Sequence, residues 1–398
     1  MKKLNLGLLF GGRSCEHEVS VTSARSILNA IDLDKYNVCL IGIDKSGHWH
    51  LADDFDALIS DGAVKFSNHH LTGSVAGSVA APANALDSAG TGHDKGSDDL
   101  ITLDLHNQGN LAAARNPARH ISPPALDVIF PVLHGTFGED GTLQGVFEMA
   151  GIPYVGCGVA ASALAMDKAL AKKIFQAAGI PQATYTGFTA REWKRDPGKI
   201  MDQSEFRLGY PVFVKPANLG SSVGISKAHG RDQLKTAIEL AFDFDNKIVI
   251  EQSMENCLEV ECAVLGNHDP QASVVGEINP GAEFYDYTTK YIDDKSELTV
   301  PANLPDEATS RVRELSIAAF KAIDGAGLAR VDFFVHKDTW QVILNEVNTL
   351  PGFTPISMYP RLWAASGVSY SELIDRLIEL ALEIHQSKAT LQRAFELP

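Results

Sequence analysis

Residues 329–348 carry the most specific chemical pattern in the chain and read ARVDFFVHKDTWQVILNEVN. A turn in the middle of this stretch places Asp332 opposite Glu346, and strand alternation puts Arg330 on the same face. Two carboxylates that face each other across strands repel unless a cation lies between them. Because Mg²⁺ takes carboxylate and amide oxygens, the hairpin predicts a metal site at Asp332, Glu346 and Asn348. A solvated polar face is the alternative, but both strands are otherwise apolar.

A glycine- and serine-rich loop follows a predicted strand at 211–215, within PVFVKPANLGSSVGIS. The strand delivers Lys215 to its end. Glycines allow the backbone to approach a phosphate closely, and the hydroxyls of Ser221 and Ser222 add donors. The spacing is not that of the Walker loop, and an ordinary hairpin loop is the alternative. We expect a phosphate-binding loop here.

Two further segments have the composition of loops that border a site. Residues 283–294, EFYDYTTKYIDD, would make a poor core. They predict a closing loop in which Lys290 meets a phosphoryl group and Tyr291 meets a substrate, with an aromatic strand as the alternative. Residues 348–360 form a rigid turn whose backbone N–H groups, beside Arg330, could hold an oxyanion. A plain structural turn explains that segment equally well.

Glu16 and Glu18 lie at the tip of the first predicted strand-to-helix turn, in SCEHEVS. One carboxylate could pair with a substrate ammonium, and the other could cap the helix. The sequence does not choose between them.

These residues need a scaffold that mixes helices with several sheets. A strand at 4–10, a glycine turn, a helix and a strand at 36–43 are an α/β signature. A second buried strand at 126–130 leads through HGTFGEDGTLQG into a helix that ends at Gly151. The remaining expected elements are a helix over 160–178, strands at 211–215, 223–227, 247–252, 259–265 and 273–278, a helix over 306–323, a hairpin at 329–347 and a last helix from Ser369. Residues 67–120 are rich in Gly, Ala, Ser and Asp and predict a long, partly flexible surface excursion.

Composition excludes several classes of protein. The 398 residues carry 34 Lys and Arg against 50 Asp and Glu, a net charge of −16, so the basic footprint of a nucleic-acid-binding protein is missing. Five scattered cysteines without a CxxC pair indicate a reducing compartment, and we expect a cytoplasmic protein. No apolar run approaches the 18 or more residues of a membrane span. The apolar start, MKKLNLGLLFGG, is better explained by a buried strand than by a signal peptide.

Taken together, these motifs closely resemble those of D-alanine–D-alanine ligases of the ATP-grasp superfamily. The resemblance runs from GGRSCEHEVSVTSA through HGTFGEDGTLQG, MDK, VKPANLGSSVGISK, FYDYTTKY and LARVDFFV to NEVNTLPGFTPISMYP. It implies a three-domain α/β and α+β fold of the ATP-grasp type with an N-terminal Rossmann-like domain. The implied domains are 1–155, an ATP-binding part at 156–255 and a catalytic part at 256–398.

The resemblance also implies site roles, position by position. Glu16 would hold the ammonium of the first D-alanine, in a network with Ser221 and Tyr291. The residues implied in ATP binding are Lys168, Lys215 and Lys290 on the phosphates, Ser222 in the covering loop, Glu251 and Glu259 on the adenine amino group and ribose, and Gln252 and Met254 at the adenine edge. Those implied at the reacting groups are Arg330 and the Gly352 backbone as oxyanion hole, Ser357 and Met358 at the second carboxylate, His134 near the substrates, and Asp332, Glu346 and Asn348 on magnesium.

The implied reaction joins two D-alanines at the expense of ATP, through an acyl phosphate, for peptidoglycan precursors. Two Mg²⁺ ions, replaceable by Mn²⁺, and a homodimer are part of this expectation. A D-alanine–D-lactate ligase or another ATP-grasp carboxylate–amine ligase would use the same scaffold, although Tyr291 resembles the dipeptide-forming type. A catalytically dead nucleotide-binding regulator would have lost residues such as Lys215 or Glu346, and both are present.

Overall fold

The computed structural model describes residues 2–52, 55–56, 101–103, 111–113, 125–279 and 297–392. The predicted closing loop, with Lys290 and Tyr291, lies outside these residues, as does most of the 67–120 excursion. Within that excursion the backbone forms two short paired strands that were not predicted, β4 (Ile101–Leu103) and β5 (Leu111–Ala113). No helix of the described chain is long and apolar enough to cross a membrane.

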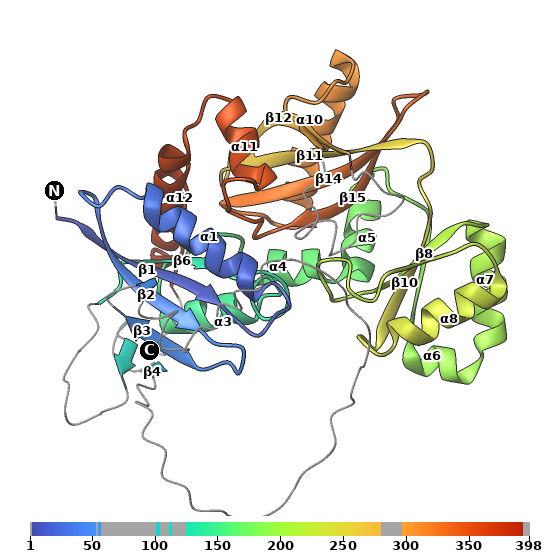
Figure 1. Cartoon of the computed structure of the whole chain (residues 1–398), viewed down its shortest axis with the longest axis horizontal. Helices are drawn as coiled ribbons and strands as arrows, with labels where there is room; N and C mark the ends of the chain where they lie inside the picture. The colour runs from blue at the N-terminus through green and yellow to red at the C-terminus, as the bar shows by residue number, and fades with distance from the viewer. Residues whose placement is uncertain are drawn as a thin grey trace, which may run out of the picture.

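The first sheet has the strand order β3-β2-β1-β6 and carries helices on both faces (Figure 1). Its elements are β1 (Leu4–Gly11), α1 (His17–Ala30), β2 (Tyr36–Ile43), β3 (Trp49–Ala52), β6 (Val128–Val132) and α3 (Thr142–Ala150). β1 pairs in parallel with both β2 and β6. Leu8 of β1 packs in the cluster that contains α1, whereas Leu9 packs with Phe147 of α3. The parallel strands therefore read as continuous apolar runs because both faces are covered.

A smaller antiparallel sheet, ordered β7-β10-β8-β9, lies at the right of Figure 1, with three short helices packed against it. Its elements are β7 (Tyr185–Thr189), α6 (Ala190–Arg195), α7 (Pro197–Leu208), β8 (Val212–Pro216), β9 (Ser226–Ala228), α8 (Arg231–Ala241) and β10 (Lys247–Gln252). Alternate residues of β8 are buried, as expected for a sheet that is covered on one face. The other face is therefore available for the site.

The third sheet, ordered β13-β12-β11-β14-β15, is antiparallel and holds the predicted hairpin. Its elements are β11 (Cys257–Leu265), β12 (Gln271–Asn279), β13 (Glu297–Thr299), α10 (Asp306–Ala322), β14 (Leu328–His336), β15 (Val342–Asn348), α11 (Met358–Ala365) and α12 (Tyr370–Ala389). α11 and α12 bury their apolar residues in the same cluster as α1 and β1. This shared core joins the third sheet to the first.

The single helix predicted over 160–178 is wrong. The chain forms α4 (Val159–Met166) and α5 (Lys168–Ala177), with Asp167 in an extended conformation between them. The Asp167 carboxylate accepts hydrogen bonds from the backbone N–H groups of Ala169 and Leu170, and it pairs with Lys247. A capping aspartate thus starts a new helix where apolar spacing alone suggested continuity. This break sets the position of Lys168 at the first turn of α5.

Candidate active site

The hairpin register is confirmed. Asp332 pairs with Glu346 and Arg330 with Asn348, and a bulge follows Asp332. The Arg330 guanidinium donates Nε to Asp332 Oδ1 at 2.8 Å and Nη2 to Oδ2 at 2.7 Å. Asn348 Nδ2 donates to the same Oδ2 at 2.9 Å. Arg330 is therefore a cation in direct contact with Asp332, one of the two paired acids.

Arg330 also contacts Glu261 of β11, at 3.0 Å from Nε to Oε2. Burial alone would lower the pKa of Arg330, but Asp332 and Glu261 together raise that pKa well above its ordinary value. The guanidinium is thus a permanent, partly buried cation in a fixed orientation. Glu261 was not among the predicted site residues, because β11 reaches β14 only through long-range pairing.

The hairpin fits a magnesium ion whose coordination is completed by a substrate. A carboxylate has about four acceptor positions. In Asp332, hydrogen bonds from Arg330 and Asn348 occupy three of them. Glu346 and Asn348 both line the adjoining pocket. No cluster of three or more His, Cys, Asp or Glu suited to a metal occurs in the described part of the chain. Phosphate oxygens and water would therefore have to supply the remaining ligands, as Mg²⁺ sites commonly require.

The predicted phosphate-binding loop is longer than expected. The strand predicted at 223–227 begins only at Ser226, because backbone hydrogen bonds from Val223 to Gly220 and from Ile225 to Ser222 extend the turn. Ser221 and Ser222 have φ of 51° and 60°, which is uncommon for residues other than glycine and is concentrated at functional sites. The Ser221 hydroxyl is buried with no hydrogen-bond partner among the described residues. This loop therefore presents an unused donor at the pocket wall.

Lysines gather beneath this loop. Lys168 Nζ donates to the carbonyl of Leu219 at 2.6 Å, and its backbone N–H donates to Ala217. Lys215 Nζ lies 2.9 Å from Glu251 Oε2. Burial would raise the pKa of Glu251, but two neighbouring lysines outweigh it and hold that pKa at about 2. The second of these is Lys172, which the sequence analysis did not single out.

One pocket joins the hairpin, the serine loop and the first sheet. Including the solvent at its open mouth, it encloses about 720 Å³. The predicted residues that line it are Glu16, His134, Lys168, Ser221, Arg330, Glu346, Asn348 and Gly352. A smaller cavity shares Lys168 and Glu346 with it and adds Lys215 and Glu251.

The structure distinguishes Glu16 from Glu18. Glu16 is buried, lines the pocket, and makes no side-chain cap to α1. Glu18 instead pairs with Lys45 at the surface, at 2.5 Å. Of the two carboxylates, Glu16 is thus the one that lines the pocket.

Two more titratable groups line the same end of the pocket. His134 Nδ1 lies 3.0 Å from the carbonyl of Leu350, and its Nε2 is buried without a partner among the described residues. Burial lowers the pKa of His134, so the ring is neutral. Burial, followed by the charge of Glu16, raises the pKa of Glu139 to about 8. Glu139 was missed because HGTFGEDG was interpreted only as a glycine turn.

The predicted oxyanion and carboxylate positions lie side by side. A Cβ on Gly352 would lie 2.9 Å from the Ser357 hydroxyl, which accepts a hydrogen bond from the Thr354 N–H at 3.0 Å. Met358 begins α11 and is buried. Among the other predicted residues that the structure describes, those that line neither of the two cavities are Ser222, Gln252, Met254, Glu259, Asp332, Ser357 and Met358.

Two antiparallel sheets and a mostly parallel sheet that meet at a pocket with paired acids, lysines and a serine loop define the ATP-grasp class of enzymes. Family models of the D-Ala D-Ala ligase N-terminus and C-terminus match residues 5–157 and 174–379. The chain therefore belongs to the D-alanine–D-alanine ligase family.

Individual relatives agree with this assignment. The D-alanine–D-alanine ligase of Acetivibrio thermocellus is 50% identical over 377 residues, which cover 94% of this chain and 95% of the relative. The solved ligase of Coxiella burnetii has a TM-score of 0.77 and 34% identity, with 98% and 97% of the two chains covered. A D-Ala:D-Ser ligase from Enterococcus faecalis gives a TM-score of 0.78 and 34% identity, covering 96% and 100%.

Proposed function

We propose that the protein joins two D-alanines to D-alanyl-D-alanine with ATP, through an acyl phosphate, for peptidoglycan precursors. The observation that carries this proposal is that Glu16, Lys168, Arg330 and Glu346 line one pocket. A carboxylate for an ammonium, a lysine for phosphates and a guanidinium for an oxyanion are thus present in one pocket. Family membership supplies the identity of the substrates.

The reaction begins when a carboxylate oxygen of the first D-alanine attacks the γ-phosphorus of ATP and ADP leaves. Glu16, with Ser221 and Tyr291, holds the ammonium of this D-alanine. Lys168, Lys215 and Lys290 neutralise the phosphates, as phosphoryl transfer requires. The serine loop with Ser222 covers the phosphates. Glu251, Gln252, Met254 and Glu259 hold the adenine and ribose.

The amine of the second D-alanine then attacks the acyl carbon, and phosphate leaves with the carboxylate oxygen. Arg330 and the Gly352 N–H stabilise the developing oxyanion in a pocket of low dielectric constant. Ser357 and Met358 lie where the carboxylate of the second D-alanine binds, and His134 borders the substrates.

Asp332, Glu346 and Asn348 would hold magnesium, which when bound supplies charge neutralisation at the phosphates. We propose two ions, with Mn²⁺ able to substitute. We further propose a cytoplasmic homodimer with no nucleic-acid or membrane partner, and domains at 1–155, 156–255 and 256–398. The sheet β7-β10-β8-β9, whose core is formed with α6, α7 and α8, supports a separate middle domain.

A second candidate is ligation of D-alanine to another acceptor, D-serine or D-lactate. The similarity of the fold to the D-Ala:D-Ser ligase from Enterococcus faecalis supports this second candidate. The two candidates share every step up to the acyl phosphate and differ only in the second substrate.

The test is ADP release over a panel of D- and L-amino acids and D-hydroxy acids, with products identified by mass. We expect ADP and D-alanyl-D-alanine with D-alanine alone, and no ADP with L-alanine. A mixed product formed in preference to D-alanyl-D-alanine would favour the second candidate. The absence of ADP with D-alanine would overturn the main proposal.

A further inference from the structure

Lys172 is a buried lysine that no step above uses. It lies one turn after Lys168 on α5, so the two side chains share a helix face. Its side chain is only 4% exposed, and its Nζ lies 3.3 Å from Glu251 Oε1. The ammonium also lies over the ring of Tyr185, at 5.4 Å from the ring centre.

Glu251 is shared between two lysines. Lys172 takes one carboxylate oxygen, and Lys215 takes the other at 2.9 Å. The three residues line the small cavity that adjoins the main pocket through Lys168 and Glu346. Tyr185 is the strand partner of Glu251, so β7 closes the cluster from the side of Lys172.

A buried carboxylate that loses its charged partners is strongly destabilised. If Lys215 were the only charged partner of Glu251, moving its ammonium to a nucleotide phosphate would carry that cost, because an adenine amino group is neutral. Lys172 removes the cost, because it keeps Glu251 paired when Lys215 leaves. It can do so without moving, since it is held by the ion pair and by the Tyr185 ring.

We propose that Lys172 is a positioning residue for nucleotide binding, which holds Glu251 so that Lys215 is released to the phosphates. This inference rests on the proposed ATP site. It assigns Lys172 no contact with the nucleotide and no role in binding D-alanine. Its effect is therefore confined to nucleotide affinity and depends on the charge of Glu251.

The test is a double-mutant cycle between Lys172→Met and Glu251→Gln, with the dissociation constant of ADP as the readout. Methionine keeps most of the buried volume without the charge. We expect Lys172→Met to weaken ADP binding about tenfold, an interaction of the size that contacting pairs show in such cycles. In the Glu251→Gln background, where no buried charge needs a partner, the same change should alter ADP binding less than about twofold.

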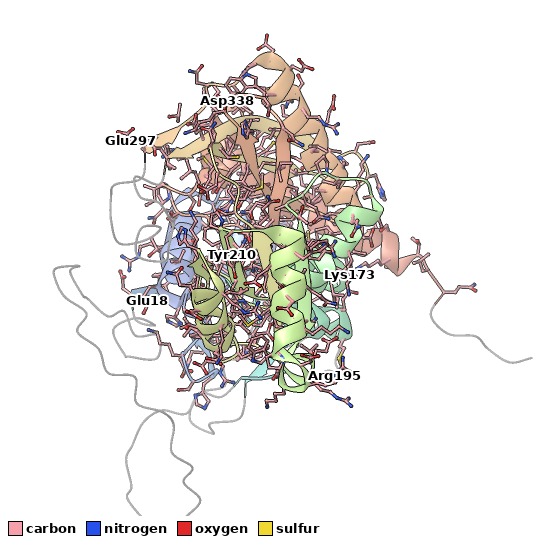
Figure 2. All side chains as sticks on the ribbon, turned by 90° about the vertical axis from the view of Figure 1, so that its right-hand side faces the viewer. Glu18, Lys173, Arg195, Tyr210, Glu297 and Asp338 are labelled. Atoms are coloured by element: carbon pink, nitrogen blue, oxygen red, sulfur yellow. The ribbon has the colours of Figure 1, made fainter. Side chains whose placement is uncertain are left out.

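Two further variants complete the test. Lys173 follows Lys172 and is exposed on the same helix (Figure 2), so Lys173→Met is the matched control and should leave ADP binding unchanged. Lys172→Arg keeps the charge and should restore part of the affinity. Lys172→Gln, which also removes the charge, replaces Lys172→Met if that variant does not fold. The KM for ATP should rise in Lys172→Met while the KM for D-alanine stays near that of the parent protein.

An equal loss of ADP affinity from Lys172→Met in both backgrounds would overturn the inference, because it would show a structural effect independent of Glu251. So would unchanged binding in Lys172→Met. Failure of the parent protein to bind ADP is a different outcome, since it would contradict the proposed ATP site itself and the inference with it.

Discussion

The two ends of the binding region carry opposite charge. The acidic end consists of Glu16, His134 and Glu139, where burial keeps the histidine ring neutral. The lysine end consists of Lys168, Lys172 and Lys215, of which Lys172 and Lys215 share the Glu251 carboxylate.

This difference shows how one acidic chain can bind both an ammonium and a polyphosphate. The net charge of −16 says little about the ligand, because charges a few ångströms away dominate in a site of low dielectric constant. Glu346 lines both cavities and so lies between the two ends. Substitutions at Glu346 and at each of the two ends therefore test this comparison.

The largest effect is expected at Glu346, between the two ends. Glu346→Ala should reduce ADP release by about 10³-fold or more while the protein stays folded, because phosphoryl transfer depends on electrostatic stabilisation at this point. Steady-state ADP release and thermal unfolding measure the two properties. Glu314→Ala, at an exposed acid on α10, is the control. Near-normal turnover in Glu346→Ala would contradict the metal assignment.

Substitutions at the acidic end and at the lysine end should affect the two substrates separately. Lys215→Met should raise the KM for ATP about 10- to 100-fold, and Glu16→Gln should raise the KM for D-alanine by a similar factor, since each loses a charge-assisted hydrogen bond. Each variant should leave the other KM within about threefold. Initial rates over both substrates check this. If either variant changed both constants equally, the division into two ends would be wrong.

A smaller effect concerns pH at the acidic end. Glu139 has a pKa of about 8 in the folded protein, raised from its ordinary value of 4.5 mainly by burial. Between these pH values the folded state holds a proton that the unfolded state has lost. The resulting stabilisation is fully present below about pH 4.5 and is lost as the pH rises towards 8, by at most about 1.4 kcal/mol per pH unit.

Glu139→Gln should remove this slope. Denaturant unfolding of both proteins between pH 5.5 and pH 8.5, a window chosen to span roughly the expected titration, measures the difference. We expect the free energy of unfolding of the parent protein to fall relative to that of the variant as the pH rises. Parallel curves would show that Glu139 is not protonated in the folded state.

The smallest effect is expected at Tyr291, which lies outside the described residues. Tyr291→Phe should weaken dipeptide synthesis and shift the product ratio towards D-alanyl-D-lactate by about a few-fold, since one hydrogen bond is lost. Competition between D-alanine and D-lactate over a range of pH measures the ratio. Unchanged ratios would count against a role for Tyr291 in choosing the second substrate.

Local pattern predicted much of the fold and part of the site. The strands at 36–43 and 247–252 and the pairing of Asp332 with Glu346 follow from alternation and turn placement, which act between near neighbours. The partnership of Lys172 with Glu251 could not be predicted in this way. It depends on α5 packing beside β10, and a lysine in an amphipathic helix is ordinarily exposed.

Burial explains the other omissions. Glu139 lies in a polar, glycine-rich motif, and only the folded chain shows that its carboxylate is enclosed beside Glu16. The break at Asp167 was overlooked because the apolar spacing continues across it, although aspartate is a common helix cap.

The central claim is that ATP activates the carboxylate of D-alanine in this pocket. Turnover with D-alanine that carries ¹⁸O in both carboxylate positions tests it most directly. The account predicts one ¹⁸O atom in each phosphate released, because the attacked acyl carbon loses the oxygen that was bonded to phosphorus. Phosphate free of ¹⁸O, with D-alanyl-D-alanine still formed, would contradict it.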